Sequence, residues 1–370
     1  MTYLDNAATT PVLPEVKAAL IAALGDEYGN ASSLHLAGRN SRTLMDEARA
    51  NLMKALGDSS QGEVIFTSGG TESDNMAVFG AAKLNAKRVG KHIVTTSVEH
   101  DAVRMAVKRL ESDGFEVTWI TPGKTGGISA EQITDAVRDD TALVSVMSVC
   151  NETGNIYPIA EIADEIKRRK LGALLHTDAV QGFMKIPLNV KHLGADLVTV
   201  SAHKIGGVKG CGALWLRLGI ALPPLLHGGG QEKGLRSGTE SVPLISAFGK
   251  AAVYSGFISG AMKDALLDGL GNLDAVILGT PEAPHIAAFA LPGIPAEALM
   301  SYLDSKGICI SRGSACKRGR RSHVWDAFEL PRKISDSAVR VSFGWQNTLE
   351  DVEVLLAALQ DAKTKIRART

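Results

Sequence analysis

The region from Glu63 to Trp215 alternates short apolar, β-branched segments with segments of helical periodicity. The strand-like segments are EVIFTS, HIVTTS, EVTWI, TALVSVMSV, ALLHTDA, DLVTVSAH and CGALWLR. Between them, residues 72–84, 101–110 and 159–169 have the apolar spacing of helices. Nearly continuous apolar strands are typical of a mostly parallel sheet that helices cover on both faces. The pattern therefore predicts an α/β fold with a doubly wound large domain.

After about Ala247 the pattern changes to that of a smaller α+β domain. A helical stretch is followed by HIAAFAL, a helix near residues 296–305, the segment ICISRGSAC, the strand-like VRVSFG and a helix from Leu349 onward. No tandem repeat or low-complexity segment interrupts this order. We expect a large domain over residues 15–247 and a small domain formed by residues 1–14 and 248–370.

Composition and charge narrow the class of protein. The chain has 370 residues, of which 45% are hydrophobic and 22% charged, as in ordinary folded proteins and unlike disordered or fibrous ones. Lys plus Arg equals Asp plus Glu, at 40 each, so nucleic acid and anionic membranes are not expected as partners. The chain starts without a secretory pattern, and no apolar run approaches the length of a membrane span, which predicts a cytoplasmic enzyme.

Polar residues follow five of the predicted strands at the point where each strand ends. GGTES, VEHDAV and CNETG follow three strands, Asp178 and Gln181 follow a fourth, and His203 and Lys204 follow a fifth. Ligands of open α/β sheets bind beyond the carboxyl ends of the strands. We therefore expect one binding site at this edge, and no metal ligand set is predicted there.

One part of this site is suited to a phosphate group. In GGTES, Gly70 and Thr71 open a helix whose backbone N–H groups and dipole favour an anion. Ser201 and His203 would add donors if the strand ends are adjacent. An ordinary helix cap formed by Thr71 or Ser68 is the alternative interpretation.

Lys204 and Asp178 together indicate pyridoxal phosphate (PLP). Partial desolvation after an apolar strand favours the neutral amine that forms a Schiff base with an aldehyde. A carboxylate near a pyridine nitrogen keeps that nitrogen protonated, which the electron-withdrawing ring requires. A solvated lysine and a helix-capping aspartate are the alternatives when each residue is considered alone.

Four further residues have side chains suited to such a site. His100 has a ring that could stack on a flat cofactor and exchange protons near neutral pH. Asn151 and Gln181 are neutral donors suited to a phenolate oxygen, and Arg340 offers a planar fork for a substrate carboxylate. Each of these assignments is ambiguous alone, and His100 could equally be a capping or exposed residue.

Cys316 is the cysteine with the strongest signs of reactivity. It lies in SRGSACKRGRRS, with small residues before it and four cations after it, Lys317, Arg318, Arg320 and Arg321. Nearby positive charge favours the thiolate, which is the nucleophilic form. Cys150, Cys211 and Cys309 adjoin apolar runs, where cysteine is usually a small buried hydrophobe.

Together these segments resemble the cysteine desulfurases of the NifS/IscS type, fold-type I PLP enzymes, over nearly the whole chain. The matching segments are YLDNAATT, FTSGGTESDN, VEHDAV, NETG, HTDAVQ, SAHKIGGVKG, HGGGQEKGLRSGT, SRGSAC and VRVSFG. The resemblance implies conversion of L-cysteine to L-alanine, with a persulfide formed on Cys316 for a sulfur-acceptor protein.

The resemblance also implies a role for each candidate residue. Lys204 matches the PLP lysine, Asp178 the partner of the pyridine nitrogen, Gln181 the residue on the ring hydroxyl and His100 the stacking, acid–base histidine. Thr71, Ser201 and His203 match the phosphate ligands, and Asn151 and Arg340 match the substrate-carboxylate residues. Thr239, in RSGT, matches a threonine that reaches the phosphate of the other subunit, so the resemblance implies a homodimer.

The chain departs from many of these relatives in two places. KRGRRS replaces a hydroxyl-rich stretch after the cysteine, which suggests either a solvated loop or a surface that steers an acidic acceptor. The chain stops at IRART, whereas some relatives use a longer tail to dock an iron–sulfur scaffold, so the acceptor could instead be a carrier or a molybdenum-cofactor enzyme. A selenocysteine lyase, a PLP aminotransferase and a non-enzymatic interaction protein remain the alternative functions.

Overall fold

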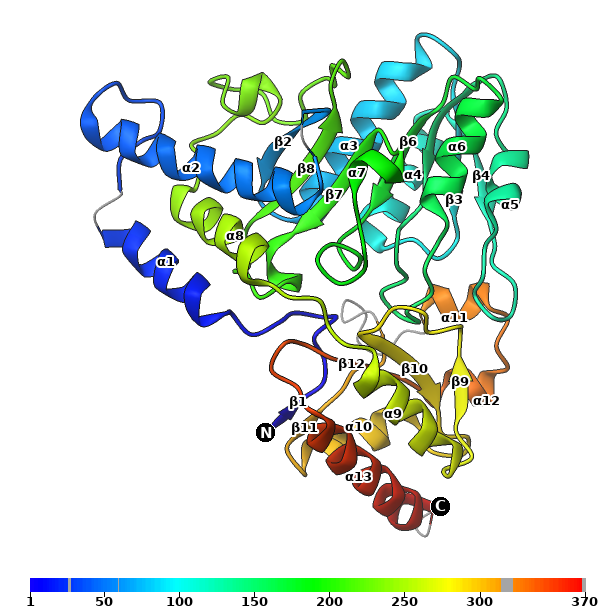
Figure 1. Ribbon diagram of the computed structural model, residues 1–370. Coiled ribbons are helices and arrows are strands. Elements are labelled where there is room, and N and C mark those ends of the chain that lie inside the picture. Colours follow the sequence, from blue (N-terminus) through cyan, green and yellow to red (C-terminus); the bar gives the residue numbers. More distant parts are fainter. Residues whose placement is uncertain (26–27, 59, 314–321, 368–370) are drawn as a thin grey trace.

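A seven-stranded sheet forms the centre of the structure, a computed structural model that describes residues 1–25, 28–58, 60–313 and 322–367 (Figure 1). In spatial order its strands are β2 (Gly62–Thr67), β8 (Gly212–Arg217), β7 (Leu197–Ser201), β6 (Leu174–Asp178), β5 (Thr141–Ser145), β3 (His92–Thr96) and β4 (Glu116–Ile120). In this sheet β8 alone runs in the direction opposite to the other strands. The predicted mostly parallel sheet and all seven of its predicted strands are confirmed.

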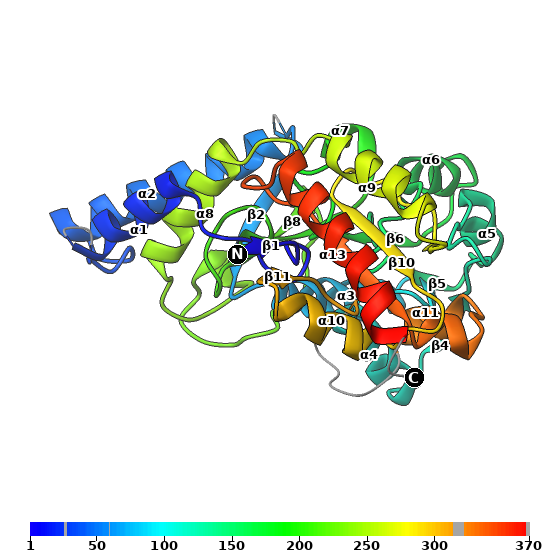
Figure 2. The ribbon, with the colours of Figure 1, turned by 90° about the horizontal axis from the view of Figure 1, so that it is seen from below.

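Helices cover both faces of this sheet, as the sequence pattern predicts. The predicted helices correspond to α3 (Gly70–Ala86), α4 (Asp101–Ser112) and α6 (Ile159–Arg168). The others around this sheet are α1 (Pro14–Gly25), α2 (Leu36–Ala55), α5 (Ala130–Asp135), α7 (Val190–Leu193), α8 (Val242–Tyr254) and the short 3-10 turns η1 (Ala202–Lys204) and η2 (Glu232–Gly234). Figure 2 shows α1, α2 and α8 projecting together to one side of the molecule.

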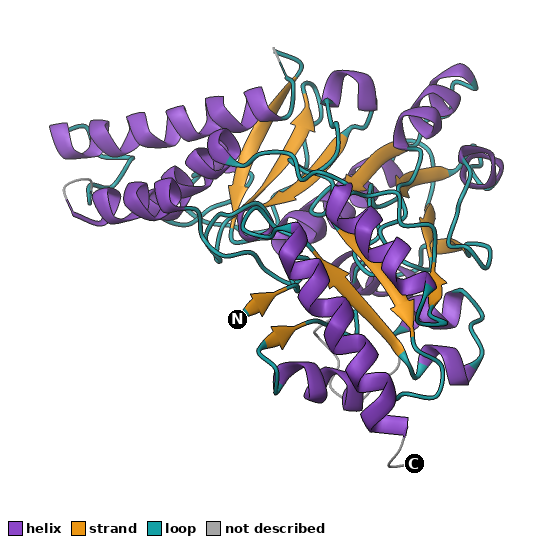
Figure 3. Cartoon of the chain, turned by 60° about the horizontal axis from the view of Figure 1, so that its bottom comes forward, coloured by secondary structure: helices purple, strands orange, loops and turns teal. Residues whose placement is uncertain are grey.

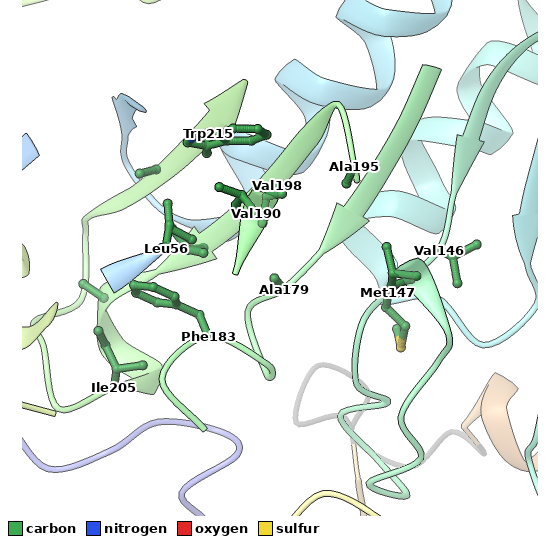
Figure 4. Packing of buried hydrophobic residues seen from close by; sticks show 14 of the residues in the cluster. Leu56, Val146, Met147, Ala179, Phe183, Val190, Ala195, Val198, Ile205 and Trp215 are labelled. Carbon is green, nitrogen blue, oxygen red and sulfur yellow. The ribbon is translucent and has the colours of Figure 1, made fainter. Parts of the chain in front are cut away.

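The pleat of β2 shows how the two faces are separated. Val64 and Phe66 belong to the core cluster that includes residues of α2, α6 and α8, whereas Ile65 belongs to the cluster beneath α3 and α4. Successive side chains of a strand point to opposite faces, so an apolar run buries both. Trp215 and Val198 of the sheet belong to the first cluster together with Leu56 and Phe183 (Figure 4).

A second, smaller α+β unit contains both chain termini (Figure 1). Its antiparallel sheet has the order β12 (Ala338–Ser342), β10 (Ile286–Ala290), β9 (Val276–Leu278), and β1 (Thr2–Tyr3) pairs in parallel with β11 (Ile308–Cys309). Its helices are α9 (Ala261–Gly271), α10 (Ala296–Asp304), α11 (His323–Ala327), α12 (Arg332–Ser335) and α13 (Leu349–Arg367). Figure 3 shows α13 crossing the small sheet, where Leu355 shares a core cluster with Phe289 and Leu4.

The two core clusters suggest where domain boundaries lie. Leu4, near the start of the chain, is buried with residues of the small sheet. The expected boundary after residue 247 falls inside α8, whose Phe248 and Ala251 are buried in the core of the large sheet. We propose two domains as expected, with the second boundary placed after Tyr254. Within the described ranges, no helix has both the length and the apolar character needed to cross a membrane.

Candidate active site

A cavity of about 250 Å³ opens at the carboxyl ends of the parallel strands. Its walls combine the residues that follow β2, β3, β5, β6 and β7 with Arg340 from the small sheet and Ala7 and Ala8 from the start of the chain. The predicted site residues that line it are Gly70, Thr71, His100, Asn151, Asp178, Gln181, Ser201, His203, Lys204 and Arg340. The sheet topology thus brings ten dispersed residues to one place.

One end of the cavity has the donors that an anion needs. The α3 helix starts there at Gly70, and no side chain caps it at Gly69, so Thr71 and Ser68 do not form the alternative helix cap. Ser201 Oγ is buried and has no hydrogen-bond partner in the described part of the chain. A helix start that no side chain caps, together with this hydroxyl, forms a cradle for a phosphate group.

Close backbone packing shapes this cradle. A Cβ atom on Gly212 would lie 2.6 Å from the backbone carbonyl carbon of Gly69, so no larger residue fits there without a shift of the loop. His203 completes the region: its Nδ1 lies 3.2 Å from Thr9 Oγ1, and burial, with the charge of Lys204 next, lowers the pKa of His203 to about 3. His203 is therefore a neutral ring at physiological pH.

Asp178 ends β6 and is held in place by the turn that follows. Its Oδ1 accepts a hydrogen bond of 2.9 Å from the Val180 N–H. Burial raises the pKa of Asp178, while the charges of His100 and Lys204 act in the opposite direction. The carboxyl group thus caps the turn and lines the cavity at the same time.

Lys204 and His100 lie on the walls around this carboxyl group. The Lys204 Nζ donates to the carbonyl oxygens of Ala7 and Ala8, at 2.7 and 2.8 Å. His100 precedes α4, and its Nδ1 accepts a hydrogen bond of 3.2 Å from the Ala102 N–H, so the ring both caps the helix and lines the cavity. Burial is the main cause that lowers the pKa of His100.

Arg340 connects the small sheet to the cavity. Its Nη1 donates to the carbonyl oxygen of Asn151 at 2.7 Å and its Nη2 to Asp5 Oδ1 at 2.8 Å, while the residue is only 2% exposed. Its Nε has no hydrogen-bond partner in the described residues. Gln181 is fixed by donating from Nε2 to the Ala7 carbonyl oxygen at 2.9 Å.

Two predicted site residues are not part of this cavity as described. Thr239 lines a separate pocket with Ser68 and Arg236. Cys316 and the basic residues that follow it lie outside the described residues, although Gly313, three positions before Cys316, lines the cavity.

The whole chain matches known proteins. A model of the family "Aminotransferase class-V" matches residues 2–355. This chain belongs to the class-V aminotransferase family. The cysteine desulfurase IscS of Methanosarcina thermophila is 40% identical to this family member over 377 residues, which cover 99% of this chain and 92% of that protein.

Solved structures agree with this assignment. A structure titled "NifS-like protein" has a TM-score of 0.90 and 34% identity, and the match covers 99% of each chain. Another, titled "SspA in complex with cysteine", has a TM-score of 0.81 and 31% identity and covers 93% of this chain and 99% of that one. The expected fold of the fold-type I PLP enzymes is confirmed.

The cavity of this class-V family member also contains a residue that the sequence analysis missed. Asp74 is buried in α3, lines the cavity and has a carboxylate oxygen within 4.8 Å of a carboxylate oxygen of Asp178 and of a ring nitrogen of His100. A signal was present in the sequence, because Thr71 and Asp74 are three positions apart and share one face of the helix.

Two buried cysteines of this chain are poor candidates for a nucleophilic thiol. Burial raises the pKa of the Cys150 thiol, and it raises that of Cys211 to about 12. Both therefore remain thiols at physiological pH. This agrees with the prediction that these two cysteines are small buried hydrophobes.

Proposed function

We propose that this class-V family member is a PLP-dependent cysteine desulfurase that converts L-cysteine to L-alanine and receives the sulfur on Cys316. The observation that supports this most is the meeting of Lys204, Asp178 and His100 in one cavity with Arg340 from the other sheet. The relatives named as cysteine desulfurases, which match nearly the full chain, support the same function.

The residues present fit pyridoxal phosphate. The start of α3 and the unpaired Ser201 hydroxyl would hold its phosphate, and Lys204 would attach it covalently. Asp178 would face the ring nitrogen and Gln181 the ring hydroxyl. When bound, the cofactor supplies an electron sink that stabilises negative charge developing on the substrate carbon.

The chain's own side chains would then orient the substrate and move its protons. Arg340 would bind the carboxylate of cysteine with a charge-assisted fork, with Asn151 beside it. His100, whose lowered pKa leaves it neutral at pH 7, would accept and return a proton. The amine of Lys204 would be the second group that moves protons.

Sulfur transfer would end on Cys316. The thiolate of Cys316 attacks the substrate sulfur, the carbon–sulfur bond breaks, and the carbon takes a proton to give alanine. The products balance the reactants: cysteine and one thiol give alanine and one persulfide. Gly313 at the cavity wall supports this proposal, since only two residues separate it from Cys316.

Further proposals concern assembly and partners. We propose a homodimer in which Thr239 contributes to the other subunit's phosphate site, because Thr239 does not line the cavity of its own chain. A sulfur-acceptor protein would take the persulfide, with Lys317, Arg318, Arg320 and Arg321 steering an acidic surface. The cytoplasmic location stays a prediction.

The decisive experiment compares Cys316→Ala with the matched control Cys309→Ala. With labelled cysteine and no added reductant, wild type and the Cys309 variant should form alanine and carry one extra sulfur in the peptide of Cys316, detected by mass spectrometry. With an added thiol reductant, which reduces the persulfide, both proteins should release sulfide. The Cys316 variant should keep the near-visible absorption of bound PLP and lose sulfide release. Continued turnover without Cys316 would instead favour an aminotransferase, and preference for selenocysteine would favour a selenocysteine lyase.

A further inference from the structure

Asp74 is a second buried carboxyl group at the floor of the cavity. It lies in the second turn of α3, is 1% exposed and has a carboxylate oxygen within 4.8 Å of an oxygen of Asp178 and of a ring nitrogen of His100. The function proposed above assigns no role to it. Because Asp74 lies beside Asp178, a negative charge on Asp74 would also act on any positive group that pairs with Asp178.

Among the described residues, no lysine or arginine forms an ion pair with Asp74. Its Oδ1 has no hydrogen-bond partner in the described residues, and the nearest basic atom in an ion-pair geometry is His176 Nε2 at 3.6 Å. Burial lowers the pKa of His176 to about 3, so this ring is neutral. Both of its nitrogens already have partners, Ser145 Oγ at 2.9 Å and Thr199 Oγ1 at 3.1 Å.

Asp178 has the better environment of the two for carrying charge. Burial raises the pKa of Asp178, but the hydrogen bond from the Val180 N–H and the charge of Lys204 favour its ionised form. For Asp74, burial raises the pKa well above its ordinary value and the charge of Asp178 adds to this, with Thr199 acting in the opposite direction. Two close carboxylates in a site of low polarity cannot both ionise readily.

We propose that Asp74 is a positioning residue that holds a proton in the folded protein and leaves Asp178 as the one negative charge facing the cofactor's ring nitrogen. An ionised Asp74 would place a second negative charge at the same end of the cavity. That charge would draw a proton onto Asp178 and weaken its pairing with the ring. Asp74 thus acts through Asp178, and the cofactor part of this role rests on the proposed function.

Proton linkage tests the proposal without cofactor or substrate. Asp74→Asn has nearly the same shape and cannot ionise. A protonated Asp74 binds one more proton in the folded than in the unfolded chain, so wild type loses stability relative to the variant as the pH rises from about 4 through the folded pKa. The ratio of the two folding equilibrium constants should change by up to about tenfold per pH unit in this range.

The comparison isolates Asp74 from the other titrating groups around it. Glu99, His100, His176, Asp178 and Lys204 face the same region and remain in both proteins. Denaturant unfolding of the PLP-free full chain from pH 5 to pH 8 measures the difference. A difference that is constant across this range would overturn the proposal, and Asp74→Ser provides the same comparison should the Asn variant not fold.

A second readout uses the PLP-loaded enzyme. Because Asn and a protonated Asp are both uncharged, the pH midpoint of the near-visible absorption should agree between Asp74→Asn and wild type. A shift of about one pH unit would show that Asp74 is ionised and contradict the proposal. Failure of the wild type to bind PLP would reject the proposed cofactor, while the unfolding experiment would still decide the protonation of Asp74. Loss of PLP binding by Asp74→Asn alone would contradict the proposal.

Discussion

Arg340 of the small sheet donates a 2.7 Å hydrogen bond to the backbone carbonyl oxygen of Asn151, which follows β5 of the large sheet. This bond and the ion pair with Asp5 fix the guanidinium at the edge of the cavity. Arg340, from the small sheet, thus completes a site in which most other groups follow the strands of the large sheet.

Arg340→Lys should weaken cysteine binding while keeping the positive charge. Lysine cannot reproduce the planar fork, and losing one charge-assisted hydrogen bond of about 2 kcal/mol corresponds to a rise in KM of about 10- to 100-fold. Steady-state sulfide release measures KM. Asp5→Asn is the control, because it removes the ion pair and keeps the guanidinium group with its hydrogen bond to Asn151; an equal KM effect from both variants would contradict a direct contact of Arg340 with substrate.

Ser201→Ala should weaken PLP binding without weakening the fold. The Ser201 hydroxyl is buried and unpartnered in the described residues, so its removal costs the PLP-free protein no hydrogen bond. A lost phosphate contact of about 1–2 kcal/mol predicts a PLP dissociation constant about 5- to 30-fold higher. Equilibrium dialysis measures the binding and thermal unfolding the stability; a large loss of stability in the PLP-free variant would mean that the hydroxyl has a structural role.

His176 should make the protein sensitive to acid. Its pKa is about 3 in the folded protein because the ring is buried, and about 6.5 when unfolded. The unfolded chain therefore binds an additional proton between these pH values, and stability falls as the pH is lowered from about 6.5 towards 3. His176→Gln should reduce this dependence by up to about 1.4 kcal/mol per pH unit in that window.

Denaturant unfolding at several pH values between 4 and 7 measures the effect of His176. His192→Gln is the matched control because His192 is exposed, and its slope should equal that of wild type. Identical slopes for the His176 variant and wild type would show that another group dominates the acid response.

Gly313→Ala should impair sulfur transfer more than cofactor binding. Gly313 has φ +115°, and a Cβ there would lie 2.6 Å from Glu152 Oε2, so either the Glu152 side chain or the backbone at Gly313 must shift. Backbone strain of about 1–3 kcal/mol predicts a fall in sulfide release of about 5- to 100-fold with a normal PLP spectrum. Gly219→Ala, at φ +90° with no atom within 4 Å, controls for strain alone.

Sequence and structure agree most closely where local pattern decides. The strand-like runs that end at Asp178 and before Lys204 are β6 and β7, and the polar groups beyond them do line one cavity. The predicted boundary after residue 247 falls within α8, where the helical pattern is the same on both sides, and our boundary after Tyr254 stays a proposal. Which core Phe248 enters depends on contacts that are remote in sequence.

The sequence alone determined the order of the elements, the period with which each buries its side chains and the identity of the polar residues at the strand ends. Periodicity follows from local backbone geometry, and for that reason it can be read without the fold. Only the tertiary structure decided that Asp74 faces Asp178 and that Arg340 reaches Asn151. These pairs come from separate segments, and their distances, burial and charge states exist only after the two sheets and their helices have packed together.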